Sequence, residues 1–224
     1  MMVWGVGIGV LLLLGFMFYA SYSIASGVYL KVLCRLPQTG RSVLLTFDDG
    51  PDPVQTAKVL DVLREHQLQA LFFVVGERAQ QCPDLLRQMV ADGHLIGIHT
   101  WRHQSSFPMQ SAAAIAEDLQ RCCDTLQSIT GQRPVLFRPP FGVTNPPIAK
   151  AVGRLGLKAV GWSIRSYDTV ASRSRERVAD RIFRRLKPGA ILLLHDDRPD
   201  SEILLRLLIE GLRERSYTIT TPSL

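Results

Sequence analysis

The amino-acid sequence predicts an α/β fold, a distorted (β/α) barrel of about seven parallel strands that follows an N-terminal transmembrane helix. Short apolar runs alternate with amphipathic stretches beyond residue 30, which is the pattern of repeated strand–helix units. Polar clusters follow several of these runs, as they do at the rim of a parallel barrel. The first thirty residues carry no charged side chain. With 46% hydrophobic and 21% charged residues, the 224-residue chain fits one globular domain with one appendage, and a disordered protein is excluded.

Residues 1–30 are predicted to form a retained transmembrane anchor. An apolar centre at residues 10–18 is flanked by Trp4 and by Tyr19, Tyr22 and Tyr29. About 20 apolar residues cross a bilayer, and aromatic rings favour its edges. A secretory signal peptide, cleaved or uncleaved, is the alternative, but the missing Lys or Arg before the apolar centre favours the anchor. We therefore expect a single-pass membrane protein.

Residues 31–40 are interpreted as a basic connector, and residues 41–224 as the α/β domain. Lys31 and Arg35, with Arg41 at the start of the domain, follow the predicted span, and no acidic residue precedes Asp48. The positive-inside rule therefore places the domain in the cytoplasm. The substrate considered below would place it outside, so both orientations stay open.

The elements of the domain follow from apolar runs and from start and stop signals. Strands are expected at residues 43–47, 71–75, 95–99, 136–138, 159–162, 191–194 and 217–220. Helices are expected at residues 53–66, 83–91, 111–129 and 174–186. Pro opens the first helix, and Gly or Pro-Gly follows the others.

Charge and cysteine content exclude two other classes of protein. The net charge is +6 and the pI is near 9.4. This excess of basic residues is too diffuse to indicate nucleic-acid binding. The four cysteines contain no C-x-x-C pair and are too few for a disulfide-stapled scaffold, so we expect buried or incidental thiols. The sequence does not fix an oligomeric state.

Two motifs at predicted strand ends suggest a metal site. Asp48 and Asp49 stand where an apolar strand breaks into a Gly-Pro turn, so both carboxylates can face one place. His99 and His103 are four residues apart, a spacing that lets two imidazoles reach one metal ion. One aspartate and two histidines would bind a divalent cation, and the second aspartate would be free as a general base. Zinc is the first expectation, and cobalt, nickel, manganese and iron fit the same ligands.

A proton donor is expected on the same rim. His195 ends the apolar run at residues 191–194, and a carboxylate that favours its imidazolium form would make it an effective acid. Asp168 is the candidate for that carboxylate. Arg138, which precedes two prolines, can orient a carboxylate with its fork-shaped guanidinium.

These residues resemble the polysaccharide deacetylase family, also called the NodB-homology domain, over roughly residues 41 to 220. Five motifs stand in the family's order: Thr46-Phe47-Asp48-Asp49-Gly50-Pro51-Asp52, His99-Thr100-Trp101-Arg102-His103, Arg138-Pro139-Pro140-Phe141-Gly142, Trp162 through Asp168, and Leu193-Leu194-His195-Asp196. The resemblance implies metal-dependent hydrolysis of an acyl group from an amino sugar.

The resemblance also implies a role for each candidate residue. Asp48 matches the base and Arg138 the arginine that holds it, while His195 matches the general acid, tuned by Asp168. The implied metal ligands are Asp49, His99 and His103. The implied substrate contacts are Leu193 at the acetyl methyl group, the peptide N–H of Phe141 at the oxyanion, and Trp162, which opens the fourth motif.

The sequence departs from the family pattern at two positions. Thr169 follows Asp168 where the family usually has Trp, and Phe141 stands where Tyr is common. We expect a hydrolase that removes N-acetyl groups from N-acetylglucosamine-containing glycans such as peptidoglycan or chitin oligosaccharides, with an unusual acceptor preference. The alternatives are a de-N-acylase or deformylase of a lipid-linked amino sugar, an O-acetyl esterase, and a catalytically silent glycan-binding barrel.

Overall fold

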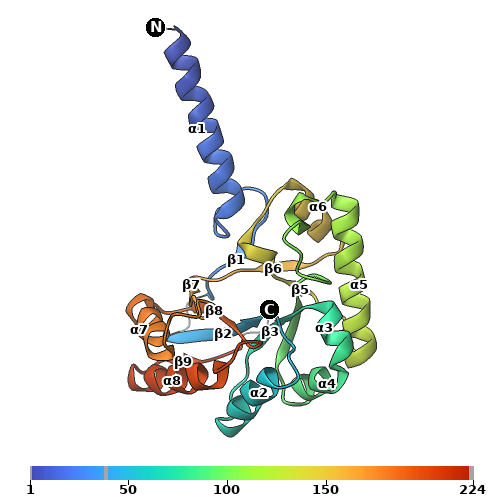
Figure 1. The fold of residues 1–224 in the computed structure, drawn as a ribbon, viewed down its shortest axis with the longest axis vertical. Helices are drawn as coiled ribbons and strands as arrows, with labels where there is room; N and C mark the ends of the chain where they lie inside the picture. The colour runs from blue at the N-terminus through green and yellow to red at the C-terminus, as the bar shows by residue number, and fades with distance from the viewer. Residues whose placement is uncertain (1, 38–39, 222–224) are drawn as a thin grey trace.

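The computed structural model describes residues 2–37 and 40–221, with side chains of the first helix from Ile8 onward. The first residue of the expected anchor, two residues of the expected connector and the last three of the expected domain lie outside the described residues. Figure 1 shows a curved sheet with α2 to α8 around its outer side, while α1 projects away from the domain.

Nine strands form one sheet in the order β1-β6-β5-β4-β3-β2-β8-β7, with β9 paired to β2. Every pairing between these strands is parallel. The strands are β1 (Val32–Leu33), β2 (Ser42–Asp48), β3 (Leu71–Val74), β4 (Leu95–Ile98), β5 (Leu136–Phe137), β6 (Lys158–Val160), β7 (Ile164–Arg165), β8 (Ala190–His195) and β9 (Thr218–Ile219). This parallel α/β sheet fits the predicted (β/α) barrel.

Seven of the described helices cover the outer face of the sheet: α2 (Gln55–Glu65), α3 (Gly76–Gln81), α4 (Pro83–Ala91), α5 (Ala112–Thr130), α6 (Pro146–Arg154), α7 (Arg175–Arg185) and α8 (Ser201–Glu214). The projecting helix α1 spans Met2–Tyr22, and two short 3-10 turns lie at Phe107–Met109 and Pro140–Gly142. Ser111, Asn145 and Ser174 cap the N-termini of α5, α6 and α7 through their side-chain oxygens.

Strand β2 is buried along its whole length because helices cover one face of the sheet and the barrel interior covers the other. Val43, Leu45 and Phe47 join the large core beneath the helices, whereas Leu44 joins the smaller interior core. Side chains alternate along a strand, so Asp48 lies on the interior face with Leu44. The carboxyl end of β2 therefore presents Asp48 to the inside of the barrel.

The register brings the polar strand ends together. Asp48 pairs with Phe73 of β3 on one side and with His195 of β8 on the other. Parallel strands end at the same edge of a sheet, so side chains at these ends share one rim.

All seven expected strands are present with small shifts of their ends, and two further strands were not predicted. Strands β1 and β7 are only two residues long, too short to give an apolar run. The four expected helices match α2, α4, α5 and α7, while α3, α6 and α8 fill the remaining gaps.

The predicted single-pass membrane anchor in residues 1–30 is wrong. Among the residues that the structure describes, no helix combines the length and the apolarity needed to cross a membrane. A crossing takes about 20 apolar residues. The last turn of α1 is held by the domain, because the Thr144 N–H donates to the Ser21 carbonyl at 2.9 Å and the Thr144 hydroxyl donates to the Ala20 carbonyl at 3.2 Å.

Candidate active site

The turn after β2 directs two adjacent carboxylates toward one place. Asp49 has a positive φ of 73°, and a cis peptide bond joins Gly50 to Pro51. The pleat of the strand is broken there, and both carboxylates approach the same ring nitrogen. Asp48 Oδ2 lies 3.8 Å and Asp49 Oδ1 lies 3.7 Å from His99 Nε2.

Asp49, His99 and His103 form a group that could hold a metal ion. One ligand atom from each lies within 4.8 Å of the others, and Asp49 Oδ1 is 3.6 Å from His103 Nε2. Asp49 Oδ1 is buried and has no hydrogen-bond partner among the described residues. Two imidazole nitrogens and one carboxylate are donors that suit a divalent transition metal ion, so the residues present fit such an ion.

The protonation state of His99 suits a metal ligand. Its Nδ1 lies 2.8 Å from the backbone carbonyl of Arg138, a contact that places the ring proton on Nδ1 and leaves the Nε2 lone pair toward Asp49. Burial lowers the pKa of His99 and outweighs the opposing charge of Asp48. The ring is therefore held neutral.

His103 reaches the site from a tight loop rather than from a helix. Thr100 and His103 both have positive φ, of 73° and 51°. The Thr100 hydroxyl accepts a hydrogen bond from the His103 N–H at 2.9 Å. This loop places the two imidazole rings side by side, with centres 4.7 Å apart and planes tilted by 38°.

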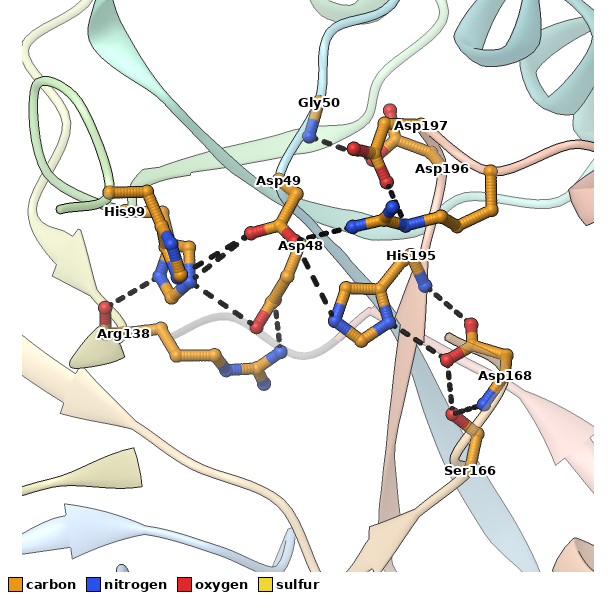
Figure 2. Close-up of polar contacts among 12 residues, drawn as sticks. Asp48, Asp49, Gly50, His99, Arg138, Ser166, Asp168, His195, Asp196 and Asp197 are labelled. Atoms are coloured by element: carbon orange, nitrogen blue, oxygen red, sulfur yellow. Dashed lines mark hydrogen bonds and ion pairs between the residues drawn. The ribbon is translucent and has the colours of Figure 1, made fainter. Parts of the chain in front are cut away.

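Asp48 is paired with a fully buried arginine. Arg138 Nη1 donates to Asp48 Oδ1 at 2.6 Å and to the Thr46 hydroxyl at 2.7 Å. Its Nη2 donates to the Gly161 carbonyl at 2.7 Å and its Nε to the Val160 carbonyl at 3.2 Å. Burial lowers the pKa of Arg138 against the opposing charge of Asp48. The network fixes one oxygen of Asp48 and leaves the other toward His99, as Figure 2 shows.

His195 and Asp168 form a second pair on the same rim. Two contacts join them: His195 Nδ1 lies 2.8 Å from Asp168 Oδ1, and the His195 N–H donates to Asp168 Oδ2 at 2.8 Å. Burial disfavours the imidazolium, but the hydrogen bond and charge of Asp168 outweigh it and raise the pKa of His195 to about 9. Burial opposes the charge of Asp168 as well, yet His195 and the Ser166 hydroxyl hold its pKa below the usual value. The opposite ring nitrogen, Nε2, faces the site at 3.9 Å from Asp49 Oδ2.

The predicted substrate contacts lie around these groups. The Phe141 ring is half exposed and packs edge-on against His103 with centres 4.8 Å apart. The Trp162 ring lies 5.7 Å from the guanidinium carbon of Arg138. Leu193 pairs with Thr46 and is 4% exposed. The structure thus brings all ten predicted residues to one rim.

Several polar residues of this rim were given no role from the sequence, among them Thr46, Asp196 and Arg198. Thr46 supports Arg138, and its place two residues before Asp48 on a strand is a signal that could have found it. Asp196 accepts a hydrogen bond from the Gly50 N–H at 3.2 Å. Arg198 Nη2 lies 3.6 Å from Asp49 Oδ2. Asp196 stands beside His195 in the fifth motif, and this place is a signal that could have found it. The contact of Arg198 with Asp49 joins distant parts of the chain, and no local pattern marks it.

Comparison with known proteins identifies relatives of the chain. The family model described as polysaccharide deacetylase matches residues 35–160. A chitooligosaccharide deacetylase of Sinorhizobium fredii is 36% identical over 208 residues, which cover 85% of this chain and 94% of that protein. A peptidoglycan-N-acetylglucosamine deacetylase of Bacillus cereus is 32% identical over 196 residues, covering 86% and 91%.

Solved structures show the same architecture. A peptidoglycan N-acetylglucosamine deacetylase in complex with a hydroxamate-type ligand superposes with a TM-score of 0.79 at 26% identity, covering 85% of this chain and 90% of that one. A family 4 acetyl xylan esterase from Clostridium thermocellum, in complex with a cobalt ion, has a TM-score of 0.74 at 35% identity, covering 80% and 87%. The predicted resemblance is confirmed, and so is the predicted class of deacetylating hydrolase. The motifs, the shared fold and relatives aligned over nearly their whole length agree that this chain belongs to the polysaccharide deacetylase family.

Proposed function

We propose that the protein is a metal-dependent hydrolase that removes the N-acetyl group from N-acetylglucosamine units of a glycan. The observation that carries the proposal is the juxtaposition on one rim of three metal-ligand side chains, an arginine-held carboxylate and a carboxylate-held imidazole. The relatives named for chitooligosaccharide and peptidoglycan deacetylation support this substrate class.

Asp49, His99 and His103 would hold the cation. Zinc is the ion that we propose first, because two imidazoles and one carboxylate are frequent zinc ligands, and cobalt, nickel, manganese and iron suit the same set. A divalent cation there would supply a water of lowered pKa and polarise the amide carbonyl.

Asp48 would take the proton from the attacking water. Arg138 holds Asp48 Oδ1 through a buried, charge-assisted hydrogen bond, which leaves Oδ2 to accept that proton. The same bond keeps the carboxylate from rotating. We infer that Arg138 positions the base and does not itself touch the substrate.

His195 would protonate the departing amine nitrogen. Its raised pKa keeps the imidazolium form at neutral pH, and Asp168 fixes Nδ1 so that Nε2 carries the transferable proton toward the site. An amine leaves poorly without protonation, so this group is required for the second half of the reaction.

The remaining predicted residues would position the acyl group. The peptide N–H of Phe141 would donate to the developing oxyanion, a contribution of about 3 kcal/mol for one well-placed donor. Leu193 would line the pocket for the acetyl methyl group, and Trp162 would form an apolar wall beside Arg138.

Acetate release from an N-acetylated chitooligosaccharide by the purified protein tests the proposal. We expect release with added zinc or cobalt, loss of release after chelation, and recovery when the metal is restored. Turnover that persists after complete metal removal would refute the metal-dependent mechanism. The absence of release from every N-acetylated glycan tried, in metal-loaded protein, would refute the deacetylase.

An O-acetyl esterase is the second candidate, favoured by the 35% identity to the acetyl xylan esterase. The same base and ligand set would serve ester hydrolysis. An alkoxide leaves more readily than an amine, so an esterase depends less on His195. Acetylated xylan, offered in parallel with the chitooligosaccharide, separates the two candidates by kcat/KM.

A further inference from the structure

A cluster of arginines surrounds Tyr167 in the loop directly before Asp168. The guanidinium carbons of Arg181, Arg165 and Arg173 lie 4.5, 5.1 and 5.2 Å from the centre of the Tyr167 ring. All three are close to one point, so their mutual separations are comparable to the screening length of about 8–10 Å at physiological salt. The face of the ring offsets only part of this repulsion.

The positive charge of this cluster is not balanced within the described part of the chain. No ion pair there joins any of the three arginines to a carboxylate. Arg173 Nη1 and Arg181 Nε are also buried and have no hydrogen-bond partner among the described residues. Buried donors without acceptors cost folding free energy, so these guanidiniums are available to an acceptor that the chain does not supply.

The cluster opens to the surface beside α7. Arg173 and Arg181 line a hollow there together with two further arginines, Arg177 and Arg184, and the exposed carboxylate of Asp180. Residues 165–187 contain eight basic and three acidic side chains, whereas the whole chain has a net charge of only +6. The basic excess is therefore not diffuse, as expected from the net charge alone, but largely concentrated in this segment. Planar guanidiniums in such numbers suit the oxygens of a phosphate group.

The cluster adjoins the reacting groups. Tyr167 is the chain neighbour of Asp168, which holds His195, and Arg175 Nη1 donates to the Asp168 carbonyl at 2.9 Å. Arg165 lies on β7 and pairs with Leu193 of β8, two residues before His195. A ligand bound at the arginines would therefore lie on the His195 side of the site.

We propose that Arg165, Arg173 and Arg181, arranged around Tyr167, form a subsite for a phosphate group carried by the amino-sugar substrate. The proposal rests on the proposed deacetylase function and narrows its substrate to a phosphorylated N-acetylamino sugar. The phosphate is either a monoester on the sugar or part of a diphosphate diester that links the sugar to a carrier.

Kinetics with matched substrates test the subsite. The readout is the ratio of kcat/KM for acetate release from N-acetylglucosamine 1-phosphate to that from the neutral methyl glycoside of N-acetylglucosamine. For the unaltered protein we expect a ratio of about ten or more, because the phosphate gains charge-assisted hydrogen bonds to the arginines that the methyl glycoside does not make. UDP-N-acetylglucosamine forms a third arm, and a higher kcat/KM on it than on the monoester identifies the diester as the bound form.

Three variants make the result specific. In Arg173→Gln/Arg181→Gln, and in the exposed single variant Arg165→Gln, we expect the ratio to fall toward one. Arg41→Gln is the matched control, because Arg41 also stacks on a tyrosine, with 4.7 Å between its guanidinium carbon and the Tyr217 ring centre, and stands before the start of β2. A ratio near one in the unaltered protein, or a ratio that the cluster variants leave unchanged, overturns the subsite.

Calorimetric titration with inorganic phosphate tests the phosphate subsite separately from the proposed deacetylase function, because the binding measurement needs no turnover. Phosphate binding that is retained in Arg41→Gln and lost in the double variant supports the subsite even if no acetate is released, a result that would reject only the deacetylase. Acetate release without any difference in phosphate binding between the proteins rejects only the subsite.

Discussion

The carboxylate of Asp196 clamps the backbone of Gly50. Asp196 Oδ1 accepts the Gly50 N–H at 3.2 Å, and its other oxygen accepts a hydrogen bond from the Thr56 hydroxyl. A side chain at position 50 would collide with the Asp196 carboxyl group. The clamp therefore depends on glycine, and it fixes the residue that directly follows Asp49.

Gly50→Ala is expected to weaken metal binding without unfolding the protein. The added methyl group must push Asp196 away and shift the turn that aims Asp49 at His99 and His103. We expect a loss of about 10–100-fold in zinc affinity, the range found when a hydrogen-bonding partner of a metal ligand is removed. Titration of the apoprotein with zinc measures the effect. Gly153→Ala is the control, because a Cβ at that position meets no other atom within 4 Å; equal affinities of the two variants would contradict the prediction.

Asp48→Asn and Asp49→Asn are expected to differ in metal content. Asp48 is held by Arg138 and has the role of base, so its amide variant should lose turnover while binding about as much zinc as the unaltered protein. Asp49 offers its unpartnered oxygen to the two imidazoles, so its amide variant should lose both zinc and turnover. Zinc per protein chain after dialysis, measured by atomic emission, is compared between the variants. The same zinc content in both would refute this division of roles.

Asp168→Asn is expected to move the alkaline limb of the pH profile of kcat to lower pH. In the folded protein the pKa of His195 is raised to about 9, so the imidazolium acid persists up to that pH and is lost above it. Burial alone lowers this pKa, and Asp168 supplies the largest opposing contribution. Removal of its charge therefore lets burial dominate, and the proton leaves at lower pH. An unchanged alkaline limb in the metal-loaded variant would show that His195 is not the titrating acid.

Much of this rim could be predicted from the sequence because its residues stand at the ends of apolar strands. Asp48, His99 and His195 follow runs that the alternation of strands and helices brings to one edge. The clamp of Asp196 and the arginines around Tyr167 could not be predicted, since each depends on contacts between separate segments. The positive φ of Tyr167, 62°, turns its loop in a way that no residue pattern indicates.

The N-terminal segment shows where composition misleads. Apolar residues without charge predicted a membrane span, yet the last turn of α1 is held through Thr144. Hydropathy counts apolar residues and does not register the hydrogen bonds that join the last turn of this helix to the domain. Strand β1 was not predicted either, because its two residues, Val32 and Leu33, pair with β6 through their backbone and do not form a long apolar run.

Arg138→Gln is expected to destabilise the fold as well as to lower kcat. The guanidinium is fully buried and donates to Asp48, Thr46 and two backbone carbonyls, so its removal leaves a buried carboxylate unpaired. Breaking a buried ion pair in this way costs about 3–5 kcal/mol. The free energy of unfolding from urea titration measures the loss. In Asp48→Asn/Arg138→Gln the unpaired charge is absent, so this double variant should be more stable than Arg138→Gln alone, and the reverse order would contradict the account.

Thr169→Trp is expected to change which glycan the enzyme prefers more than it changes hydrolysis. Thr169 is exposed and follows Asp168, whose contacts to His195 run through its own side chain and not through that of Thr169. An indole at this position adds apolar surface to the loop that carries Tyr167 and Asp168, which favours stacking against a sugar ring over contact with a charged group. We expect the kcat/KM for a neutral chitooligosaccharide to rise relative to that for N-acetylglucosamine 1-phosphate, while kcat on the preferred substrate is kept. A steep fall of kcat on every substrate would contradict this prediction. It would show that proton transfer by His195 depends on the backbone around Asp168, and that Thr169 supports the reacting centre.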